Sequence, residues 1–322
     1  MATSIGSDAC RSGPTVPMPL PDAQGPADLE IGAGGFVAAF RPGAGGRMSR
    51  LVHPAIGDVV VPMDTRSFAP FDWPKAGAYP LFPFHNRVID GVVAFEGCEY
   101  RIAPHPALAP DAIHGPAHRR PWTAVEHSAD SLSLELAHQA DADWPFDFTA
   151  QQHFAIAPDR LLVTLRLRNN GQGNMPGGLG WHPYFRAATD QRAETDASLA
   201  FPLDGKDLPT ASDAIPRPPG ALPAATAYTI HLAGWQTARI DMATGWEVEV
   251  KALEGVPHLS VHRMKDYICI EPVSHRAGVL GDPENAIRHG FGMLTPGQMI
   301  EGRFAIIVQP ARREAIAACA GC

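Results

Sequence analysis

Three segments of the 322-residue sequence place an ionisable side chain beside a turn-forming residue. They are "IHG" at His114, "GWHPYF" around His182 and "CIEP" around Glu271. The prolines after His182 and Glu271 bias both residues toward extended backbone, so both side chains can be held rigidly above one sheet face. An imidazole with a reference pKa of about 6.5 can donate a proton at neutral pH, and a carboxylate with a pKa of about 4.3 can accept one. These residue types predict a general acid/base pair that needs no cofactor.

Metal binding is the main alternative role for these histidines. A single histidine is more often a core or loop residue bonded to backbone, and the chain has 14 of them. His114 and His118 are four residues apart, a spacing that suits two ligands on one helix face. Gly115 and Pro116 lie between them and disfavour a helix, and no H-x-H pair completes a site. We therefore expect no metal.

Other catalytic motifs are incomplete in this sequence. The glycine clusters "GAGGFV", "GAGGRM" and "GQGNMP" each lack the last glycine of a dinucleotide-binding loop. Neither the phosphate-binding loop G-x-x-x-x-G-K-[ST] nor the nucleophile motif G-x-S-x-G occurs. We expect no nucleotide and no other cofactor.

The elements that must position these residues are β-strands. Apolar and polar residues alternate in residues 131–138, 161–168 and 246–251, the pattern of strands with one buried face. Asp90-Gly91 and Glu96-Gly97 divide three strand-like runs and predict two successive hairpins. With 31 glycines, 32 prolines and few helical windows, the chain predicts an all-β fold, a large antiparallel β-sandwich.

One domain is expected over residues 28–310, because 45% hydrophobic content is enough for a large core. Residues 1–27 are rich in small residues and proline and predict a flexible N-terminal arm, and residues 311–322 predict a C-terminal tail. The Pro-rich stretch 201–227 predicts a long excursion between strands, since strand patterns resume directly after it.

Charge and cysteine usage limit the partners and the compartment. The net charge of −8 comes from scattered residues without a Lys/Arg run, so we expect neither nucleic acid nor a membrane as partner. The sequence contains no run of about 18 apolar residues, the pattern that would predict a membrane helix. Five scattered cysteines and the lack of a secretory signal pattern favour a cytoplasmic location. The terminal "CAGC" has metal-site spacing but no second pair, and we expect no role for it.

The segments around Arg87, His114, His182 and Glu271, taken in their order along the chain, resemble the aldose 1-epimerase family, also called galactose mutarotases. "HNRVIDGVVAFEGCEYRI" resembles the family's Asn-Arg strand and hairpin, "IHG" and "WHPYF" its two histidine motifs, and "CIEP" its glutamate motif. "DWPFDF", "LLVTLRLRNNG" and "LTPGQ" resemble framework segments. The resemblance runs from about Leu29 to Val308 and implies a β-sandwich of the galactose-mutarotase type with an open cleft on one sheet.

The resemblance also implies an activity and a role for each site residue. The chain would interconvert the α and β anomers of a free aldose, a small-molecule sugar substrate, and would be a monomer or homodimer. Glu271 would take the proton of the anomeric hydroxyl while His182 protonates the ring oxygen. His114 would hydrogen-bond near that oxygen, and Arg87 beside Asn86 would hold sugar hydroxyls through its fixed fork of donors.

One position departs from the family pattern. The family usually carries a substrate-binding aspartate a few residues before a Gly-Trp pair, and here "YTIHLAGW" puts Thr229 there. Threonine can donate or accept a hydrogen bond but cannot supply a charge-assisted one, so galactose itself is not implied as the substrate. Asp204 or Asp207 could substitute if the correspondence shifts within residues 201–227.

Two alternatives stay open on the same fold. A hexose-6-phosphate mutarotase needs cations for the phosphate, and Arg119-Arg120 could be offered for them, although adjacent strand residues point to opposite faces and favour a structural pair. A carbohydrate-binding module without turnover would be compatible with the missing aspartate. The retained Glu271 and His182 argue against that module.

Overall fold

The computed structural model describes residues 28–64, 68–210, 213–242, 245–281, 286, 288 and 290–312. The expected N-terminal arm lies outside these residues, as do the "CAGC" segment and all but two residues of the expected tail. Within the described residues, no helix is long and apolar enough to cross a membrane.

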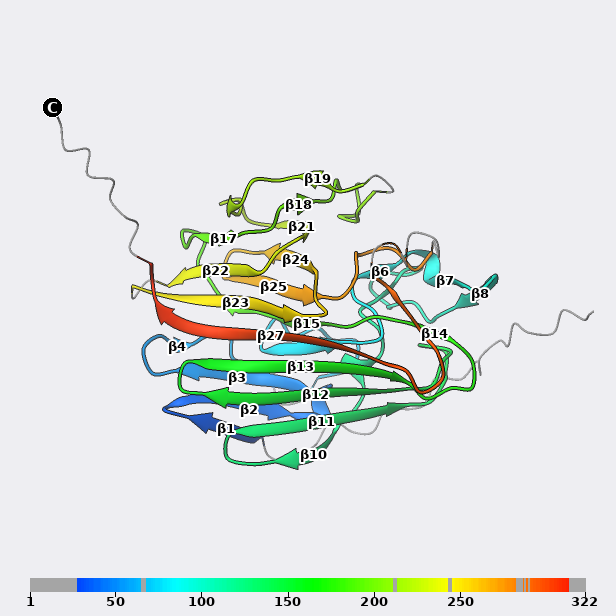
Figure 1. The fold of residues 1–322 in the computed structure, drawn as a ribbon, viewed down its shortest axis with the longest axis horizontal. Coiled ribbons are helices and arrows are strands. Elements are labelled where there is room, and N and C mark those ends of the chain that lie inside the picture. Colours follow the sequence, from blue (N-terminus) through cyan, green and yellow to red (C-terminus); the bar gives the residue numbers. More distant parts are fainter. Residues whose placement is uncertain are drawn as a thin grey trace, which may run out of the picture.

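The larger of two antiparallel sheets has twelve strands in the described part of the chain (Figure 1). Its order is β1-β2-β3-β5-β15-β25-β24-β21-β18-β19, with β4 beside β3 and β16 beside β25. The strands are β1 Leu29–Ala33, β2 Phe36–Arg41, β3 Arg47–His53, β4 Gly57–Asp58, β5 Ala78–Leu81, β15 Gly180–Pro183, β16 Phe185–Arg186, β18 Leu199–Ala200, β19 Ile215–Pro216, β21 Tyr228–Ala233, β24 His258–Arg263 and β25 Tyr267–Val273.

The second sheet has nine described strands in the order β10-β11-β12-β13-β27-β23-β22-β17-β20. They are β10 Thr123–His127, β11 Ser131–His138, β12 Phe148–Ala157, β13 Arg160–Asn169, β17 Ala193–Thr195, β20 Gly220–Ala221, β22 Thr237–Met242, β23 Trp246–Glu254 and β27 Met299–Pro310. Three small pairs join β6 Arg87–Val88 with β9 Ala112–Ile113, β7 Val92–Phe95 with β8 Cys98–Arg101, and β14 Met175–Gly177 with β26 Gly292–Leu294. The 3-10 helices are η1 Pro42–Ala44, η2 Ile89–Gly91 and η3 Ala117–Arg119.

The core lies between the two sheets, as the alternating sequence pattern predicts. Trp181 of β15 contacts Phe154 of β12 at 6.3 Å and Phe304 of β27 at 5.6 Å between ring centroids, so the larger sheet packs directly on the smaller one. Leu132 and Leu134 of β11 are fully buried in the same cluster. The expected all-β antiparallel sandwich is confirmed.

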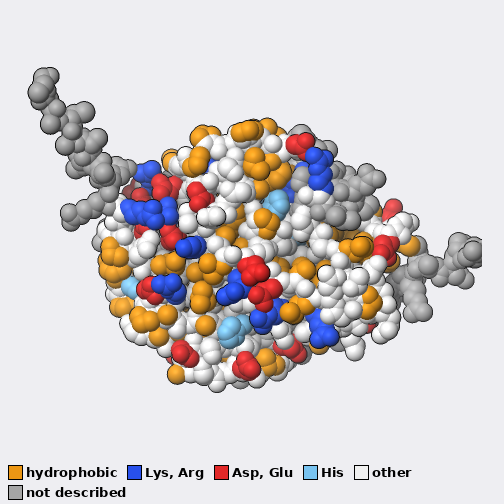
Figure 2. Space-filling model, viewed as in Figure 1, with side chains coloured by type: hydrophobic (Ala, Val, Ile, Leu, Met, Phe, Trp, Pro, Cys, Tyr) orange, Lys and Arg blue, Asp and Glu red, His pale blue; other side chains and the backbone are white. Residues whose placement is uncertain are grey.

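The outer face of the nine-stranded sheet carries interspersed charges. Figure 2 shows acidic and basic side chains mixed with hydrophobic ones over this face. Arg166 pairs with Glu301 at 2.6 Å and Arg239 with Glu249 at 2.7 Å, each pair joining neighbouring strands. Strands β12 and β13 alternate buried and partly exposed residues along their length, so each of them has one wet face and one dry face.

One of the two predicted hairpins is wrong. The turn at Glu96-Gly97 joins β7 to β8 as expected, but β6 pairs with β9 and not with β7. The Asp90 N–H donates to the Asp111 carboxylate at 3.1 Å, which ties the end of β6 to the segment before β9. A strand of two residues therefore takes its partner from further along the chain, and this brings Arg87 beside the turn that carries His114.

Candidate functional site

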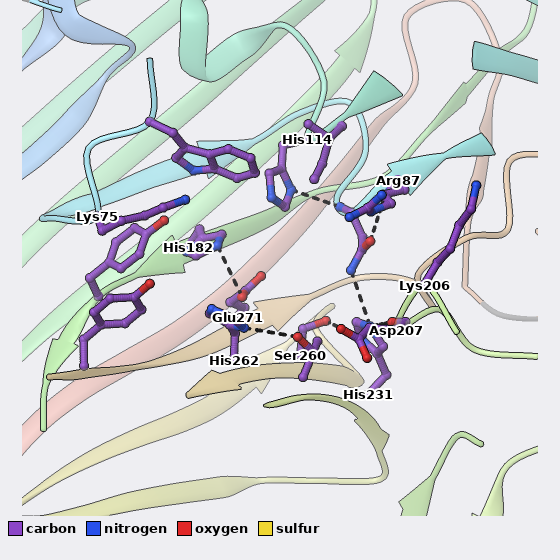
Figure 3. A pocket seen from close by; sticks show the side chains of 16 residues that line it. Lys75, Arg87, His114, His182, Lys206, Asp207, His231, Ser260, His262 and Glu271 are labelled. Atoms are coloured by element: carbon purple, nitrogen blue, oxygen red, sulfur yellow. Dashed lines mark hydrogen bonds and ion pairs between the residues drawn. The ribbon is translucent and has the colours of Figure 1, made fainter. Parts of the chain in front are cut away.

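The candidate site is a cavity of about 210 Å³ on one face of the twelve-stranded sheet (Figure 3). All six residues that the sequence singles out line this cavity: Asn86, Arg87, His114, His182, Thr229 and Glu271. Three of them come from strands β15, β21 and β25, Arg87 begins β6, and Asn86 and His114 lie directly beside β6 and β9. The structure therefore gathers residues from distant parts of the chain at one place.

The register between β15 and β25 sets His182 opposite Glu271. Gly180 pairs with Val273, and because the strands are antiparallel, His182, two residues after Gly180, is set opposite Glu271, two residues before Val273. Residues two apart share a face, and directly opposed residues have Cβ atoms about 5 Å apart. Sheet pairing by itself thus places the carboxyl next to the imidazole.

The prolines beside these residues lie within strands and not in turns. Pro183 ends β15 and pairs with Ala78, and Pro272 is the last residue but one of β25 and pairs with Leu259. Proline has no N–H to donate to a ladder. Between β25 and the β15–β16 segment, residues pair at Gly180 and at Phe185 and Arg186, on either side of His182.

The Glu271–His182 pair belongs to a row of opposed residues that crosses five strands. Glu271 pairs with Ser260 of β24, and Ser260 pairs with His231 of β21. On the other side His182 pairs with Tyr79 of β5. Apart from Tyr79, which packs beneath the imidazole, these residues line the cavity.

A second row lies two residues along, and its members His262 and Thr229 line the cavity. Cys269 pairs with His262, which pairs with Thr229, and the Thr229 hydroxyl lies 3.1 Å from His262 Nδ1. Between the rows lie Val261 and Ile270, which point the other way and belong to the core. Each of the strands β21, β24 and β25 therefore carries a polar, an apolar and a second polar residue at consecutive positions.

Glu271 and His182 form a close and buried pair. Oε1 of Glu271 lies 3.4 Å from Nε2 of His182, and each residue is only 5% exposed. The rings of Tyr79 and Tyr184 pack nearly parallel to the imidazole at centroid distances of 4.7 and 4.8 Å. Tyr79 also accepts a hydrogen bond of 2.7 Å from the indole of Trp73. This packing fixes the plane of the imidazole.

Burial favours the uncharged form of both members of the pair. It raises the pKa of Glu271 to about 8. Burial, reinforced by His114 and His262, lowers the pKa of His182 well below its ordinary value. Nδ1 of His182 has no hydrogen-bond partner among the described residues, so no acceptor there stabilises an imidazolium. At pH 7 the pair therefore holds one proton, on the carboxyl, which is the reverse of the distribution expected from reference pKa values.

His114 and Asn86 hold each other at the wall of the cavity. Both have a positive φ, 62° and 59°, and the His114 N–H donates to the Asn86 carbonyl at 3.0 Å. The Asn86 N–H in turn donates to Nδ1 of His114 at 3.0 Å, so the neutral ring carries its hydrogen on Nε2. The Asn86 side-chain oxygen accepts the Arg87 N–H at 2.7 Å. The turn thus presents an imidazole donor and a guanidinium side by side.

Nine further lining residues were not predicted as site residues from the sequence, and five of them are Lys75, Lys206, His231, Ser260 and His262. Nε2 of His231 lies 3.2 Å from the Asp207 carbonyl, and its Nδ1 lies 2.8 Å from the Ser260 hydroxyl. The spacing of polar residues two apart in "TIH" and "SVH" is the signal that could have found the histidines. Lys75 precedes β5 and carries no comparable signal.

Asp207 brings a carboxylate to the rim of the cavity from the excursion 201–227. Thr229 also lines the cavity, so both residues considered for the missing aspartate are present in one place. Asp204 instead accepts backbone N–H groups of its own turn, from Lys206 at 2.8 Å and Leu208 at 3.0 Å. Of the two acids, Asp207 is the one that can meet a ligand.

Arg119 and Arg120 are held by ion pairs away from the cavity. Arg119 lies in η3, not in a strand, and pairs with Asp143 at 3.3 Å. Arg120 pairs with Asp141 at 2.7 Å and also with Asp143. Neither arginine lines the cavity, so this pair is structural and gives no support to a phosphate site.

Among the described residues, one group of side chains has metal-ligand geometry. Ligand atoms of His182, Cys269 and Glu271 lie within 4.8 Å of one another. Burial, followed by the charge of Glu271, raises the pKa of the Cys269 thiol well above its usual range, which opposes the thiolate that a metal would need. A metal here would also occupy both members of the acid/base pair.

A β-sandwich with a buried carboxyl–imidazole pair, ringed by hydrogen-bonding side chains, defines a site suited to proton transfer on a small polar molecule. Residues 28–229 match the family model described as aldose 1-epimerase, so the chain belongs to the aldose 1-epimerase family. The match includes five of the six predicted residues and ends before Glu271. The resemblance read from the sequence is confirmed.

Similar proteins support the same fold. The uncharacterized protein YphB of Escherichia coli K12 is 35% identical over 123 residues, which span 38% of this chain and 41% of YphB. A galactose mutarotase-like protein from Clostridium acetobutylicum superposes with a TM-score of 0.77 at 18% identity, covering 87% of this chain and 94% of that one. The GalM/aldose epimerase homologue of C. elegans gives a TM-score of 0.76 at 16% identity, with coverages of 89% and 99%.

Proposed function

We propose that the chain is a mutarotase that interconverts the α and β anomers of a free aldose by ring opening and reclosure. The observation that carries the proposal is the Glu271–His182 pair, 3.4 Å apart and buried on the floor of a cavity. Anomer exchange needs one proton acceptor at the anomeric hydroxyl and one proton donor at the ring oxygen. A carboxyl and an imidazole that share one proton supply both.

The proposed ring opening balances within the pair and the sugar. The pair first passes its one proton from the Glu271 carboxyl to Nε2 of His182, 3.4 Å away. The Glu271 carboxylate then takes the proton of the C1 hydroxyl, and His182 gives its Nε2 proton to the ring oxygen. The C1–O5 bond breaks, the C1–O1 bond becomes a carbonyl, and the pair is left as carboxylic acid and neutral imidazole. Rotation about C1–C2 presents the other carbonyl face, and the reverse transfers close the ring as the other anomer.

The remaining lining residues are proposed to bind hydroxyls. Arg87 offers a planar fork of donors, and His114 offers its Nε2–H beside His182, 5.4 Å away between ring centroids. Asp207 provides a carboxylate acceptor at the opposite rim, and Thr229 a hydroxyl. Donors and acceptors on several sides suit a polyhydroxy ring better than a flat or apolar ligand.

Saturation-transfer NMR between anomer signals, across a panel of hexoses and pentoses, tests the proposal. Exchange above the uncatalysed rate for at least one sugar supports it, and Glu271→Gln should lower that rate by about 10²–10⁴-fold with little change in sugar affinity. Glu254→Gln, the same change at an exposed position of β23, is the matched control. Saturable sugar binding without exchange would instead indicate a carbohydrate-binding module.

A further inference from the structure

The cavity has more positive than negative charge among its described residues. Lys75, Arg87 and Lys206 line it. Arg87 and Lys206 share a single carboxylate, that of Asp111, at 3.5 and 3.4 Å. Lys75 makes no ion pair with any residue that the structure describes. The buried acid on the floor of the cavity, Glu271, is uncharged at neutral pH because burial raises its pKa to about 8.

Lys75 is positioned at the wall of the cavity. Its ammonium lies 3.9 Å from the centroid of the Trp73 ring, and that ring packs edge-on to His114 at 5.2 Å. The Trp73 indole also donates to the Tyr79 hydroxyl at 2.7 Å. A tryptophan fixed at both ends therefore holds the cation. Figure 3 shows Lys75 on the side of His182, across the cavity from Lys206 and Asp207.

A second cation lies behind this wall. Arg47 is 1% exposed, and its guanidinium lies 4.5 Å from the centroid of the Tyr79 ring. Its Nε and Nη1 atoms have no hydrogen-bond partner among the described residues, nor does it form an ion pair with one. Burial, and to a lesser extent the charge of Arg47, lowers the pKa of Lys75. An anion at Lys75 would relieve this repulsion.

Lys75 lies at the end of the cavity where carbon 6 of a bound aldose would lie. In the proposed function, on which this step rests, His182 serves the ring oxygen. The exocyclic carbon 6 of a hexopyranose is attached to C5, the carbon bonded to that oxygen. A substituent at carbon 6 therefore extends from the His182 end of the sugar, where Lys75 lies. Arg87, Lys206 and Asp207 lie toward the opposite end (Figure 3).

We propose that Lys75 selects aldoses that carry an anionic group at carbon 6, such as a carboxylate or a phosphate. The group accepts a charge-assisted hydrogen bond from the ammonium, which stays over Trp73. The carboxylate of a hexuronate and the phosphate of a hexose 6-phosphate share this chemistry and differ in reach. Arg119 and Arg120 play no part in it.

The test compares kcat/KM for anomer exchange of glucose and galactose with glucuronate, galacturonate and glucose 6-phosphate at low ionic strength. At least one anionic sugar should exceed its neutral counterpart, and added salt should reduce that advantage. Lys75→Met should lower kcat/KM for the anionic sugar by about 10- to 100-fold more than for the neutral one, mostly through KM. Lys75→Arg should retain the preference. Lys251→Met, which removes an exposed lysine of β23, is the control and should change neither.

Which anion responds to Lys75→Met identifies the substituent as carboxylate or phosphate. Equal effects of Lys75→Met on neutral and anionic sugars, or no effect on either, would overturn the assignment while leaving mutarotation of neutral aldoses intact. Absence of enhanced exchange for every sugar, neutral and anionic, would instead overturn the proposed function itself. The two failures are therefore separable.

Discussion

Replacing Glu271 with glutamine should change the pH dependence of stability by an amount that the structure sets. Burial raises the pKa of this carboxyl from 4.5 to about 8. Between those values the folded protein binds a proton that the unfolded chain releases, so stability falls by about 1.4 kcal/mol for each pH unit. Summed from pH 4, this linkage makes the wild type less stable by about 3 kcal/mol at pH 7 and about 5 kcal/mol at pH 9.

Glutamine keeps the shape of the side chain but cannot ionise, so Glu271→Gln should lack this loss. Urea unfolding of both proteins at several pH values between 4 and 9 measures the effect. The free energy of unfolding of the variant minus that of the wild type should rise by about 3 kcal/mol between pH 4 and pH 7. Titration of His182 contributes to both proteins and largely cancels in the difference.

The control is Glu254→Gln, the same change at an exposed position of β23, which removes no buried carboxyl. A constant difference for Glu271→Gln would refute the reasoning, because it would mean that the carboxyl is ionised in the folded protein at neutral pH. The same variant also tests catalysis, so stability and anomer exchange can be compared in one sample.

Four further outcomes are expected. Anomer exchange should decline as pH rises through about 8, where the pair loses its one proton. It should also decline at low pH, where His182, whose pKa burial lowers, takes up a proton and gives the pair two. A rate still rising above pH 8 would contradict this. His182→Asn should slow exchange by about 10²–10⁴-fold. Chelators should leave exchange unchanged, because proton transfer by Glu271 and His182 needs no metal, and loss of exchange that a divalent ion restores would contradict this. Gly115→Ala should lower the melting temperature, because its Cβ would lie 2.0 Å from the Phe82 carbonyl oxygen at a φ of +65°.

The sequence predicts the strands well where one face is buried and the other is wet. The alternating segment 131–138 is strand β11 in full, and 161–168 lies within β13. Alternation carries this information because a one-residue shift would expose the buried leucines. The pairing of short strands could not be predicted in this way. Strand β6 pairs with β9, next to a hydrogen bond between Asp90 and Asp111 that no local pattern reveals.

The site could be predicted in part for the same physical reason. His182 and Glu271 stand out because proline follows each, and the structure sets them opposite each other in register. Ser260 and His262 were missed although they alternate on a strand in the same way, because one polar residue in two is ordinary for a half-exposed strand. Lys75 lies in a connection whose course depends on the packing of Trp73, which the sequence does not encode locally.

The buried carboxyl connects the stability of the fold to the proposed chemistry. The uncharged pair that burial favours, carboxylic acid beside neutral imidazole, has the same proton distribution as the proposed intermediate in which the sugar ring is open. The energy that destabilises a charged Glu271 would therefore favour proton abstraction from the anomeric hydroxyl. A glutamate with an ordinary pKa at this position would be a weaker base for that step, and it would lower the stability of the fold less. Both consequences follow from one property, so a variant that lowers the pKa of Glu271 should gain stability at alkaline pH while it loses catalytic rate.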